Sequence, residues 1–343
     1  MRDLTDVVER LIIGESLHAD EAEAALDLIM RGDASEIQTT AFLVALRGKG
    51  ETRAELAGLV RAMRSHSTVI SPAREHLVDT AGTGGGTTTF NVSTLAALVA
   101  AGAGAAVAKH GNRSATSRCG SADVLEALGV GIETDPLTTT EAIDEIGFGF
   151  MFAPRYHPAM KYVGPVRAGL KVHTTFNILG PLTNPAGAKR QVVGVGDPSR
   201  MPLVAEALAE LGVERAWVLR SDDGLDELSI AATSKVIEVT ADGELRRFKV
   251  NPEEAGVERR ADLSGLDGGT PAENAITFRS VLAGDTGPAR DIVVLNAAAT
   301  LVVAGLADDL AAGGLLATAA LDDGSAARVL DDLVAATTKA VAS

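Results

Sequence analysis

The segment from Leu4 to Arg64 carries the hydrophobic periodicity of short amphipathic helices. Apolar residues recur at the spacing that places them on one helix face: Leu4, Val7, Val8, Leu11 and Ile12. Further along, Thr52 and Glu55 have the spacing of a capping box, in which each side chain satisfies an unpaired backbone N–H at a helix start. About four short helices are therefore predicted in this segment.

The pattern changes near residue 70, where Pro72 interrupts the helical periodicity and a strand is expected to begin at His76. Beyond this point, short apolar runs are expected to form strands: Ala105–Ala108, Phe148–Phe152, Gln191–Val195, Ala216–Leu219 and Ile292–Leu295. They alternate with helical stretches such as Ser121–Leu128, Thr138–Ile146 and Met201–Leu211. Such alternation is typical of an α/β domain with a largely parallel sheet. A domain boundary is therefore expected near residue 70.

One antiparallel edge is also expected. Asp242 and Gly243 separate the runs Val236–Val239 and Leu245–Val250, and glycine accepts the positive φ that a tight hairpin turn requires.

The charge balance restricts the classes of partner. The chain has 31 basic and 46 acidic residues, a formal charge of −15, which repels nucleic acids and anionic membrane surfaces. The N-terminus is charged, and no run of about 18 apolar residues occurs, so neither export nor a membrane span is expected. The single cysteine, Cys119, excludes an intrachain disulfide and fits a reducing compartment. We therefore expect a cytoplasmic protein with no nucleic-acid or membrane partner.

The segment from Asp79 to Thr94 is a glycine-rich turn between a predicted strand and the predicted helix Leu95–Ala101. Such a turn can bind phosphate because glycines let backbone N–H groups approach an anion at a helix N-terminus. A tight turn without a ligand is equally compatible with a glycine cluster alone. The spacing matches neither the P-loop of nucleoside triphosphatases nor the dinucleotide-binding fingerprint.

A second loop, from Lys109 to Asp123, follows the run Ala105–Ala108. Ligands of open α/β sheets bind beyond the carboxyl ends of strands, so this loop and the glycine-rich turn should face one crevice. The loop supplies the cations Lys109, Arg113 and Arg118 to an otherwise acidic chain; a solvated surface loop is the alternative. We expect His110 to hold the loop by hydrogen bonds and Cys119 to be structural.

The third element is the acidic turn Ser221–Leu228, which contains the adjacent carboxylates Asp226 and Glu227. Magnesium prefers oxygen ligands and is usually completed by water and substrate phosphates. Taken alone, this segment would be interpreted as an exposed acidic turn with no ligand. Opposite two anion-binding loops, a metal site is favoured, and together the loops describe a site for a diphosphate-bearing sugar.

These segments, with Phe152–Met160 and Phe176–Pro185, closely resemble the anthranilate phosphoribosyltransferases over nearly the whole chain, in the family's order. The resemblance implies a small N-terminal helical domain (residues 1–70, with a returning segment near 160–185) and a larger α/β domain (71–343) with a central, mainly parallel sheet, the nucleoside-phosphorylase-like phosphoribosyltransferase fold. It also implies a homodimer formed through the helical domain. The implied reaction transfers the phosphoribosyl group of 5-phosphoribosyl-1-diphosphate to anthranilate, in tryptophan biosynthesis, with two magnesium ions.

The resemblance further implies the site residues. Those matching the phosphoribosyl diphosphate positions are Gly82, Gly85, Thr89, Asn91, Ser93, Thr94, Lys109, Asn112, Ser117 and Ser121. The magnesium positions match Ser93, Asp226 and Glu227, and the anthranilate positions match Gly82, Asn112 and Arg167. No catalytic nucleophile or general base is implied, because the aromatic amine that attacks ribose C1 is already neutral at pH 7.

The sequence departs from the family at two places. The family usually has Gly-Thr-Gly-Gly-Asp-Gly-x-x-Thr, whereas Gly82–Thr89 is one residue shorter and lacks the aspartate. His173 stands where an arginine is common. Two rival functions stay open: a nucleoside phosphorylase of the same fold, which should lack the combination of Lys109–Arg113 with Asp226–Glu227, and a non-catalytic nucleic-acid-binding relative, against which the charge of −15 counts.

Overall fold

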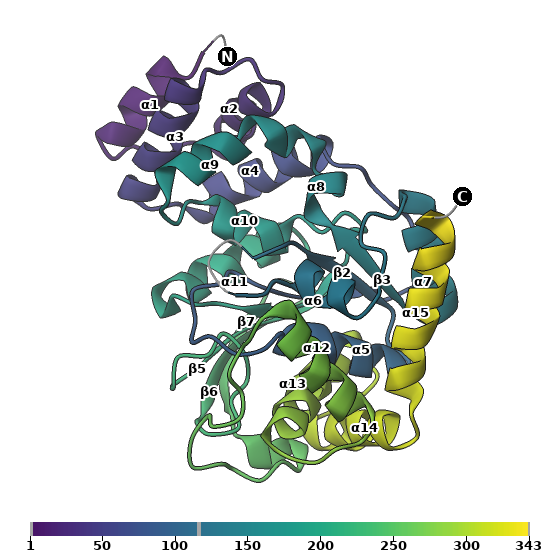
Figure 1. Cartoon of the computed structure of the whole chain (residues 1–343). Helices are drawn as coiled ribbons and strands as arrows, with labels where there is room; N and C mark the ends of the chain where they lie inside the picture. Colours follow the sequence, from purple (N-terminus) through teal and green to yellow (C-terminus); the bar gives the residue numbers. More distant parts are fainter. Residues whose placement is uncertain (1–2, 115–117, 342–343) are drawn as a thin grey trace.

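The computed structural model describes residues 3–114 and 118–341. Its N-terminal part is a bundle of helices that stands against one end of a larger α/β part (Figure 1). The bundle begins with α1 (Thr5–Ile12), α2 (Ala19–Met30), α3 (Glu36–Lys49) and α4 (Arg53–Ser65). The predicted four helices between Leu4 and Arg64 are thus confirmed.

The start of α4 is fixed by the capping box predicted from the sequence. The N–H of Glu55 donates to Thr52 Oγ1 at 3.2 Å, and the N–H of Thr52 donates to Glu55 Oε2 at 2.7 Å. Glu55 is fully buried, and it also accepts bonds from the N–H of Leu17 and from Lys49 Nζ, each at 2.9 Å. A buried carboxylate is tolerated here because every side of it is hydrogen-bonded. One side chain thereby caps α4 and ties it to α2 and α3.

A later segment returns to the bundle. It contains the 3₁₀ turn η1 (Pro158–Tyr162), α9 (Gly164–Leu170) and α10 (Phe176–Leu182). Val163, Val166 and Phe176 are buried in one apolar cluster with the side chains of α1 to α4. The cluster continues under the sheet, so the bundle and the α/β part share a core. At Val163 the 3₁₀ turn η1 gives way to α9.

A seven-stranded sheet forms the centre of the α/β part, in the order β3-β2-β1-β4-β5-β6-β7. The strands are β1 (Val78–Gly82), β2 (Val107–Gly111), β3 (Phe148–Phe152), β4 (Arg190–Gly194), β5 (Arg215–Ser221), β6 (Ser234–Thr240) and β7 (Leu245–Val250). Strands β1 to β5 pair in parallel, and β6 pairs antiparallel with both β5 and β7. The predicted fold class is therefore confirmed, as is the hairpin at Asp242–Gly243, where Gly243 has φ +79°.

Helices cover both faces of the sheet because successive strand residues point to opposite sides. On β5, Trp217 and Leu219 face the cluster with α5 (Val92–Gly102) and α13 (Pro288–Ala304), whereas Val218 faces α11 (Met201–Glu210). The remaining helices are α6 (Ser121–Ala127), α7 (Pro136–Ile146), α8 (Ala153–Tyr156), α12 (Pro271–Leu282), α14 (Leu310–Asp322) and α15 (Ser325–Val341), with 3₁₀ turns η2 (Pro198–Arg200) and η3 (Pro252–Ala255). Among the described helices, none is long and apolar enough to cross a membrane.

One predicted strand is wrong. Ile292–Leu295 lies inside α13, whose residues from Ile292 to Ala304 are all buried. A short apolar run does not distinguish a buried strand from a buried helix, because neither shows an exposed face. The deciding signals are at the ends: Pro288 occupies the first turn, and Gly305 ends the helix with φ +78°.

Candidate active site

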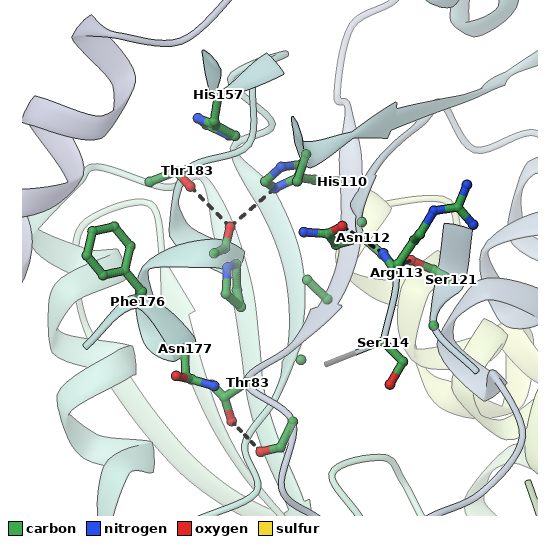
Figure 2. A pocket seen from close by; sticks show the side chains of 18 of the residues that line it. Thr83, His110, Asn112, Arg113, Ser114, Ser121, His157, Phe176, Asn177 and Thr183 are labelled. Carbon is green, nitrogen blue, oxygen red and sulfur yellow. Dashed lines mark hydrogen bonds between the residues drawn. The ribbon is translucent and has the colours of Figure 1, made fainter. Parts of the chain in front are cut away.

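A cavity of about 800 Å³ opens at the carboxyl ends of the central strands, between the sheet and the returning segment. That volume is typical of a small-molecule site. Its walls are the glycine-rich turn, the loop after β2, the segment from Pro158 to Thr183 and the acidic turn after β5. Figure 2 shows side chains from the glycine-rich turn, the loop after β2 and the returning segment around one space. The expectation that the glycine-rich turn and the loop after β2 face one crevice is confirmed.

Most of the residues singled out in the sequence line this cavity: Gly82, Gly85, Asn91, Ser93, Thr94, Lys109, Asn112, Ser121, Arg167, Asp226 and Glu227. Thr89 does not line it; its backbone pairs with Asp267 and its hydroxyl bonds the carbonyl of Phe90 at 3.0 Å. Ser117 lies outside the described residues.

The glycine-rich turn is supported from two sides. The N–H of Thr83 donates to the carbonyl of Gly194 at 2.9 Å, and the N–H of Thr87 donates to the carbonyl of Gly224 at 3.0 Å. Gly84 and Gly85 have φ of +68° and +89°, which side-chain-bearing residues rarely adopt. The turn is therefore a preformed backbone surface, held against both β4 and the acidic turn.

The turn also contacts the acidic pair directly. A Cβ added to Gly86 would lie 2.6 Å from Asp226 Oδ1, and one added to Gly82 would lie 3.2 Å from Asp226 Oδ2. The carboxylate of Asp226 consequently fills the space beside the turn. Glycine is needed at residue 86 for this close approach.

Both carboxyl groups of the acidic pair have raised pKa values. Burial raises the pKa of Asp226, and it raises that of Glu227 well above its ordinary value, helped by the neighbouring charge of Asp226 and the hydrogen bond between them. Glu227 Oε2 is closed to solvent and has no hydrogen-bond partner among the described residues, an arrangement that is costly without a ligand. Within the described part of the chain, no cluster of three His, Cys, Asp or Glu side chains that could bind a metal occurs. Two carboxylates suit magnesium, which takes its other ligands from hydroxyls, water and phosphates.

Lys109 lies behind this pair, almost fully buried. Its Nζ donates to the carbonyl oxygen of Thr80 at 2.5 Å and to Thr80 Oγ1 at 3.1 Å. Burial lowers the pKa of Lys109 to about 8, against the opposing effect of the charges of Asp79 and Glu227. The ammonium group thus stands between two buried carboxyl groups and compensates their charge.

At the far end of the cavity, Arg167 lies on α9 with its guanidinium over the ring of Phe176, 5.4 Å from the ring centre. Burial lowers its pKa, and among the described residues it has no ion-pair partner. His110 Nδ1 and Thr183 Oγ1 both bond the carbonyl of Gly180, at 3.3 and 3.2 Å (Figure 2). An unpaired guanidinium beside aromatic rings is suited to a planar carboxylate, which it can bind bidentately.

Comparisons with known proteins agree with this geometry. A model described as the glycosyl transferase family a/b domain matches residues 74–327, and one described as the glycosyl transferase family helical bundle domain matches residues 5–67. The anthranilate phosphoribosyltransferase of Desulfatibacillum aliphaticivorans is 47% identical over 96% of this chain and 97% of its own. That of Haloarcula marismortui is 50% identical over 97% of this chain and 100% of its own.

The chain belongs to the anthranilate phosphoribosyltransferase family.

Solved structures support the assignment. That of the anthranilate phosphoribosyltransferase from Thermus thermophilus has a TM-score of 0.91 at 46% identity and covers 97% of this chain and 100% of its own. Two from Saccharomyces cerevisiae, one in complex with PRPP and Mg and one with 4-fluoroanthranilate, have TM-scores of 0.89 and 0.88 at 27% and 26% identity. Each covers 98% of both chains.

The loop after β2 corrects one expectation. The cations of this loop were expected to concentrate positive charge at the crevice, but Arg113 pairs with Asp123 at 2.9 Å and with Glu126 at 2.8 Å. Arg118 lies 3.5 Å from Glu273. Sequence reasoning missed this because the acidic partners come from α6 and α12. Burial raises the pKa of Cys119 to about 11, which agrees with a structural thiol.

Several cavity residues were not singled out from the sequence as site residues. His157 and Asn177 lie within the quoted motifs Phe152–Met160 and Phe176–Pro185, so the family resemblance could have suggested them. Met63 comes from α4, and no feature of the sequence placed it at the cavity, because it has the pattern of an ordinary core residue of an amphipathic helix. His173, where this chain departs from the common family sequence, faces the glycine-rich turn: its Cε1 lies 3.3 Å from the position of a Cβ on Gly85.

The buried histidines give a pH prediction. Burial lowers the pKa of His110 to about 3 and that of His157 to about 4 from 6.5, and for His110 the neighbouring His157 contributes. Between about pH 6.5 and 4 the unfolded chain binds protons that the folded chain does not, so each histidine contributes stability that is complete above pH 6.5 and declines below it. As the pH falls, each histidine can lower the unfolding free energy by at most about 1.4 kcal/mol per pH unit.

Urea unfolding of the wild type and of His157→Gln at pH 7.5, 6 and 5 measures this contribution. We expect the unfolding free energy of the wild type to decrease more than that of the variant as the pH falls. The comparison between the two proteins is necessary because Asp79, Asp226 and Glu227, with raised pKa values, act with the opposite sign. A constant difference across the three pH values would contradict the prediction.

Proposed function

We propose that this chain transfers the phosphoribosyl group of 5-phosphoribosyl-1-diphosphate to anthranilate, giving N-(5-phosphoribosyl)anthranilate and diphosphate in tryptophan biosynthesis. One observation carries the proposal: a single cavity has a glycine-rich turn beside a half-buried acidic pair at one end and the unpaired guanidinium of Arg167 at the other. A diphosphate with its metal suits the first end, and an aromatic carboxylate suits the second.

At the diphosphate end, the family match assigns the backbone of the glycine-rich turn and several side chains to the phosphoribosyl diphosphate. The assigned residues are Gly82, Gly85, Thr89, Asn91, Ser93, Thr94, Lys109, Asn112, Ser117 and Ser121. Backbone N–H groups at the start of α5 favour a bound anion through the helix dipole. Thr89 is the weakest member of this set, because it lies outside the cavity wall.

Asp226 and Glu227, with Ser93, are proposed to hold magnesium, two ions in all. Their donor set fits, since Glu227 Oε2 is an oxygen without a partner among the described residues. When bound, magnesium would neutralise the charge that develops on the departing diphosphate.

At the acceptor end, Arg167 is proposed to bind the carboxylate of anthranilate, with Gly82 and Asn112 near its amine. The amine attacks ribose C1 as diphosphate leaves, through a transition state with oxocarbenium character. The residues contribute by holding the two substrates in line and by favouring charge on the leaving group, so no nucleophilic side chain or general base is required.

The same proposal includes domain organisation, assembly and location. The helical domain comprises residues 1–70 with the segment near 160–185, and the α/β domain residues 71–343. The helical domain is proposed to form a homodimer, because α1, the residue that follows it and α3 carry exposed apolar side chains: Ile12, Ile13, Ile37 and Val44. We propose a cytoplasmic location, which suits a chain whose single cysteine, Cys119, cannot form an intrachain disulfide.

Anthranilate fluorescence tests the reaction. Purified protein is mixed with anthranilate, phosphoribosyl diphosphate and Mg²⁺, with Mg²⁺ withheld in a parallel sample. Metal-dependent loss of the anthranilate signal, with formation of diphosphate, is the expected result. A folded wild type that leaves anthranilate unchanged would reject the proposal, and nucleobases would then be tested as acceptors.

Substitution of Arg167 tests the acceptor end. Arg167→Gln should raise KM for anthranilate by roughly 10-fold to 100-fold, because a bidentate, charge-assisted contact of about 1.5–3 kcal/mol is lost, while KM for phosphoribosyl diphosphate changes little. Lys161→Gln, which removes an exposed cation from the same cavity wall, is the matched control. Equal changes in both KM values for Arg167→Gln would contradict the assignment.

The shortened glycine-rich turn is a further hypothesis of this proposal. The missing loop aspartate is expected to alter magnesium dependence or product release. Inserting an aspartate between Gly85 and Gly86 should change the Mg²⁺ concentration for half-maximal rate, and unchanged kinetics would remove the hypothesis.

A further inference from the structure

Two polar residues interrupt the otherwise apolar stretch of helix α13 from Ile292 to Ala304. Its central stretch reads Ile-Val-Val-Leu-Asn-Ala-Ala-Ala-Thr-Leu, in which Asn296 and Thr300 are four residues apart and therefore on one face. Both are buried, with 5% and 1% of their surface exposed. A buried amide is costly unless its groups are hydrogen-bonded, so the partners of Asn296 indicate why it is there.

The side chain of Asn296 both accepts a hydrogen bond from the acidic turn and donates one to it. The N–H of Leu228 donates to Asn296 Oδ1 at 3.0 Å, and Asn296 Nδ2 donates to the carbonyl of Leu228 at 3.0 Å. A second bond from Nδ2 to the carbonyl of Ile292, at 2.8 Å, fixes the amide on its own helix. Leu228 follows Glu227 in sequence, so the amide clamps the backbone next to the acidic pair.

Glu227 depends on this clamp more than the rest of the turn does. The first half of the turn is held from within: Ser221 and Ser229 donate their hydroxyls to the carboxylate of Asp223, and the N–H of Leu225 donates to Ser221 Oγ at 3.1 Å. Glu227 Oε2, by contrast, has no hydrogen bond among the described residues. Apart from the hydrogen bond with Asp226 and the nearby charge of Lys109, the position of the backbone therefore determines where this carboxylate points.

The space between the acidic pair and α13 gives little further support. A small cavity of about 20 Å³ separates Asp226 and Glu227 from the polar face of α13, and Asn296 and Thr300 line it together with Thr80 and Ser93. A cavity of that size can hold about one water molecule, which cannot fix a side chain as packed atoms do.

We propose that Asn296 is a positioning residue for the metal site: by bonding both backbone groups of Leu228, it fixes the Glu227 carboxylate where it receives the cation. The inference rests on the proposed function, because it concerns the same acidic pair. Groups that orient metal ligands typically change metal affinity or activity by 10-fold to 100-fold when removed.

Thr300 provides a matched control. It lies on the same helix face and lines the same small cavity, yet among the described residues its hydroxyl bonds only the carbonyl of Asn296, at 2.9 Å. Thr300→Val keeps the side-chain shape and leaves the acidic turn untouched. Asn296→Ala removes the clamp, and Asn296→Leu removes it while filling the volume, which protects against loss of the fold through a new cavity.

Direct binding of Mn²⁺ in the presence of diphosphate, measured by calorimetry, tests the proposal without relying on turnover. We expect the Kd for Mn²⁺ to rise 10-fold to 100-fold in Asn296→Ala and Asn296→Leu, and by less than about threefold in Thr300→Val. In the transfer assay, raising the Mg²⁺ concentration should restore most of the kcat of the Asn296 variants, which a general loss of structure would not allow.

Two results would overturn the proposal: wild-type Mn²⁺ affinity in a folded Asn296 variant, or an equal loss in Thr300→Val. Failure of the proposed function can be distinguished from failure of this inference. A wild type that binds Mn²⁺ tightly but transfers nothing to anthranilate would reject the proposed reaction and leave the role of Asn296 intact.

Discussion

Asp226→Asn should lower kcat/KM for phosphoribosyl transfer by at least about 100-fold with little change in the unfolding free energy. The substitution keeps the shape of the side chain and removes the charge that faces both the cavity and the glycine-rich turn. Loss of residues that only orient a metal ligand already costs up to about 100-fold, and a ligand itself should cost no less. Steady-state rates at several Mg²⁺ concentrations, with urea unfolding of both proteins, measure the effect.

Asp222→Asn is the control for this prediction. Asp222 belongs to the same acidic turn, but its carboxylate is exposed and pairs with Lys235 at 2.8 Å. A surface pair of this kind contributes little, so the rate should stay within about twofold of the wild type. Similar losses in both variants would mean that the general negative potential of the turn matters, and not a ligand at Asp226.

Gly86→Ala should lower kcat/KM for phosphoribosyl diphosphate by about 10-fold to 100-fold. The φ of Gly86 is not positive, so alanine is acceptable to the backbone itself. The added Cβ would, however, lie 2.6 Å from Asp226 Oδ1 and 3.0 Å from the backbone nitrogen of Asp226. Either the glycine-rich turn or the acidic turn must move, and a displacement of about 1 Å at a reacting site can cost 100-fold in rate.

Gly48→Ala is the control for the general effect of replacing a glycine by alanine. Gly48 lies in α3, its φ is not positive, and a Cβ there would have nothing within 4 Å. Alanine should raise stability by up to about 1 kcal/mol through helix propensity and leave the kinetics unchanged. Wild-type kinetics in Gly86→Ala would mean that the contact between the two turns is free to relax and is not part of the site.

The two predictions have a common origin in the fold. Strands β1, β4 and β5 are neighbours in the sheet, and the glycine-rich turn and the acidic turn follow β1 and β5. The end of β4 lies between them: a Cβ on Gly194 would lie 1.9 Å from the carbonyl oxygen of Asp226. The glycine-rich turn and the acidic pair are thus one packed unit, which explains why a methyl group on one should disturb the other.

Local patterns in the sequence were sufficient for much of the fold. Helix periodicity and the capping box of Thr52 and Glu55 predicted the N-terminal helices, and the apolar run Phe148–Phe152 coincides with β3. These signals are readable because each depends on residues close together in the chain. The run Ile292–Leu295 was misread because α13 is buried on all sides from Ile292 to Ala304, and periodicity is lost when every face of an element is buried.

The sequence by itself determined the chemistry of the site: a glycine-rich turn, a cation-bearing loop and an acidic pair, each recognisable from residue types within a few positions. Only the tertiary structure decided how these groups are used. It pairs Arg113 with Asp123 and Glu126, buries Lys109 between two carboxyl groups, and brings Asn296 to the backbone of Leu228 across 68 positions of sequence. Hydrogen bonds and ion pairs form between neighbours in space, and the neighbours of a loop residue are chosen by how the strands and helices pack.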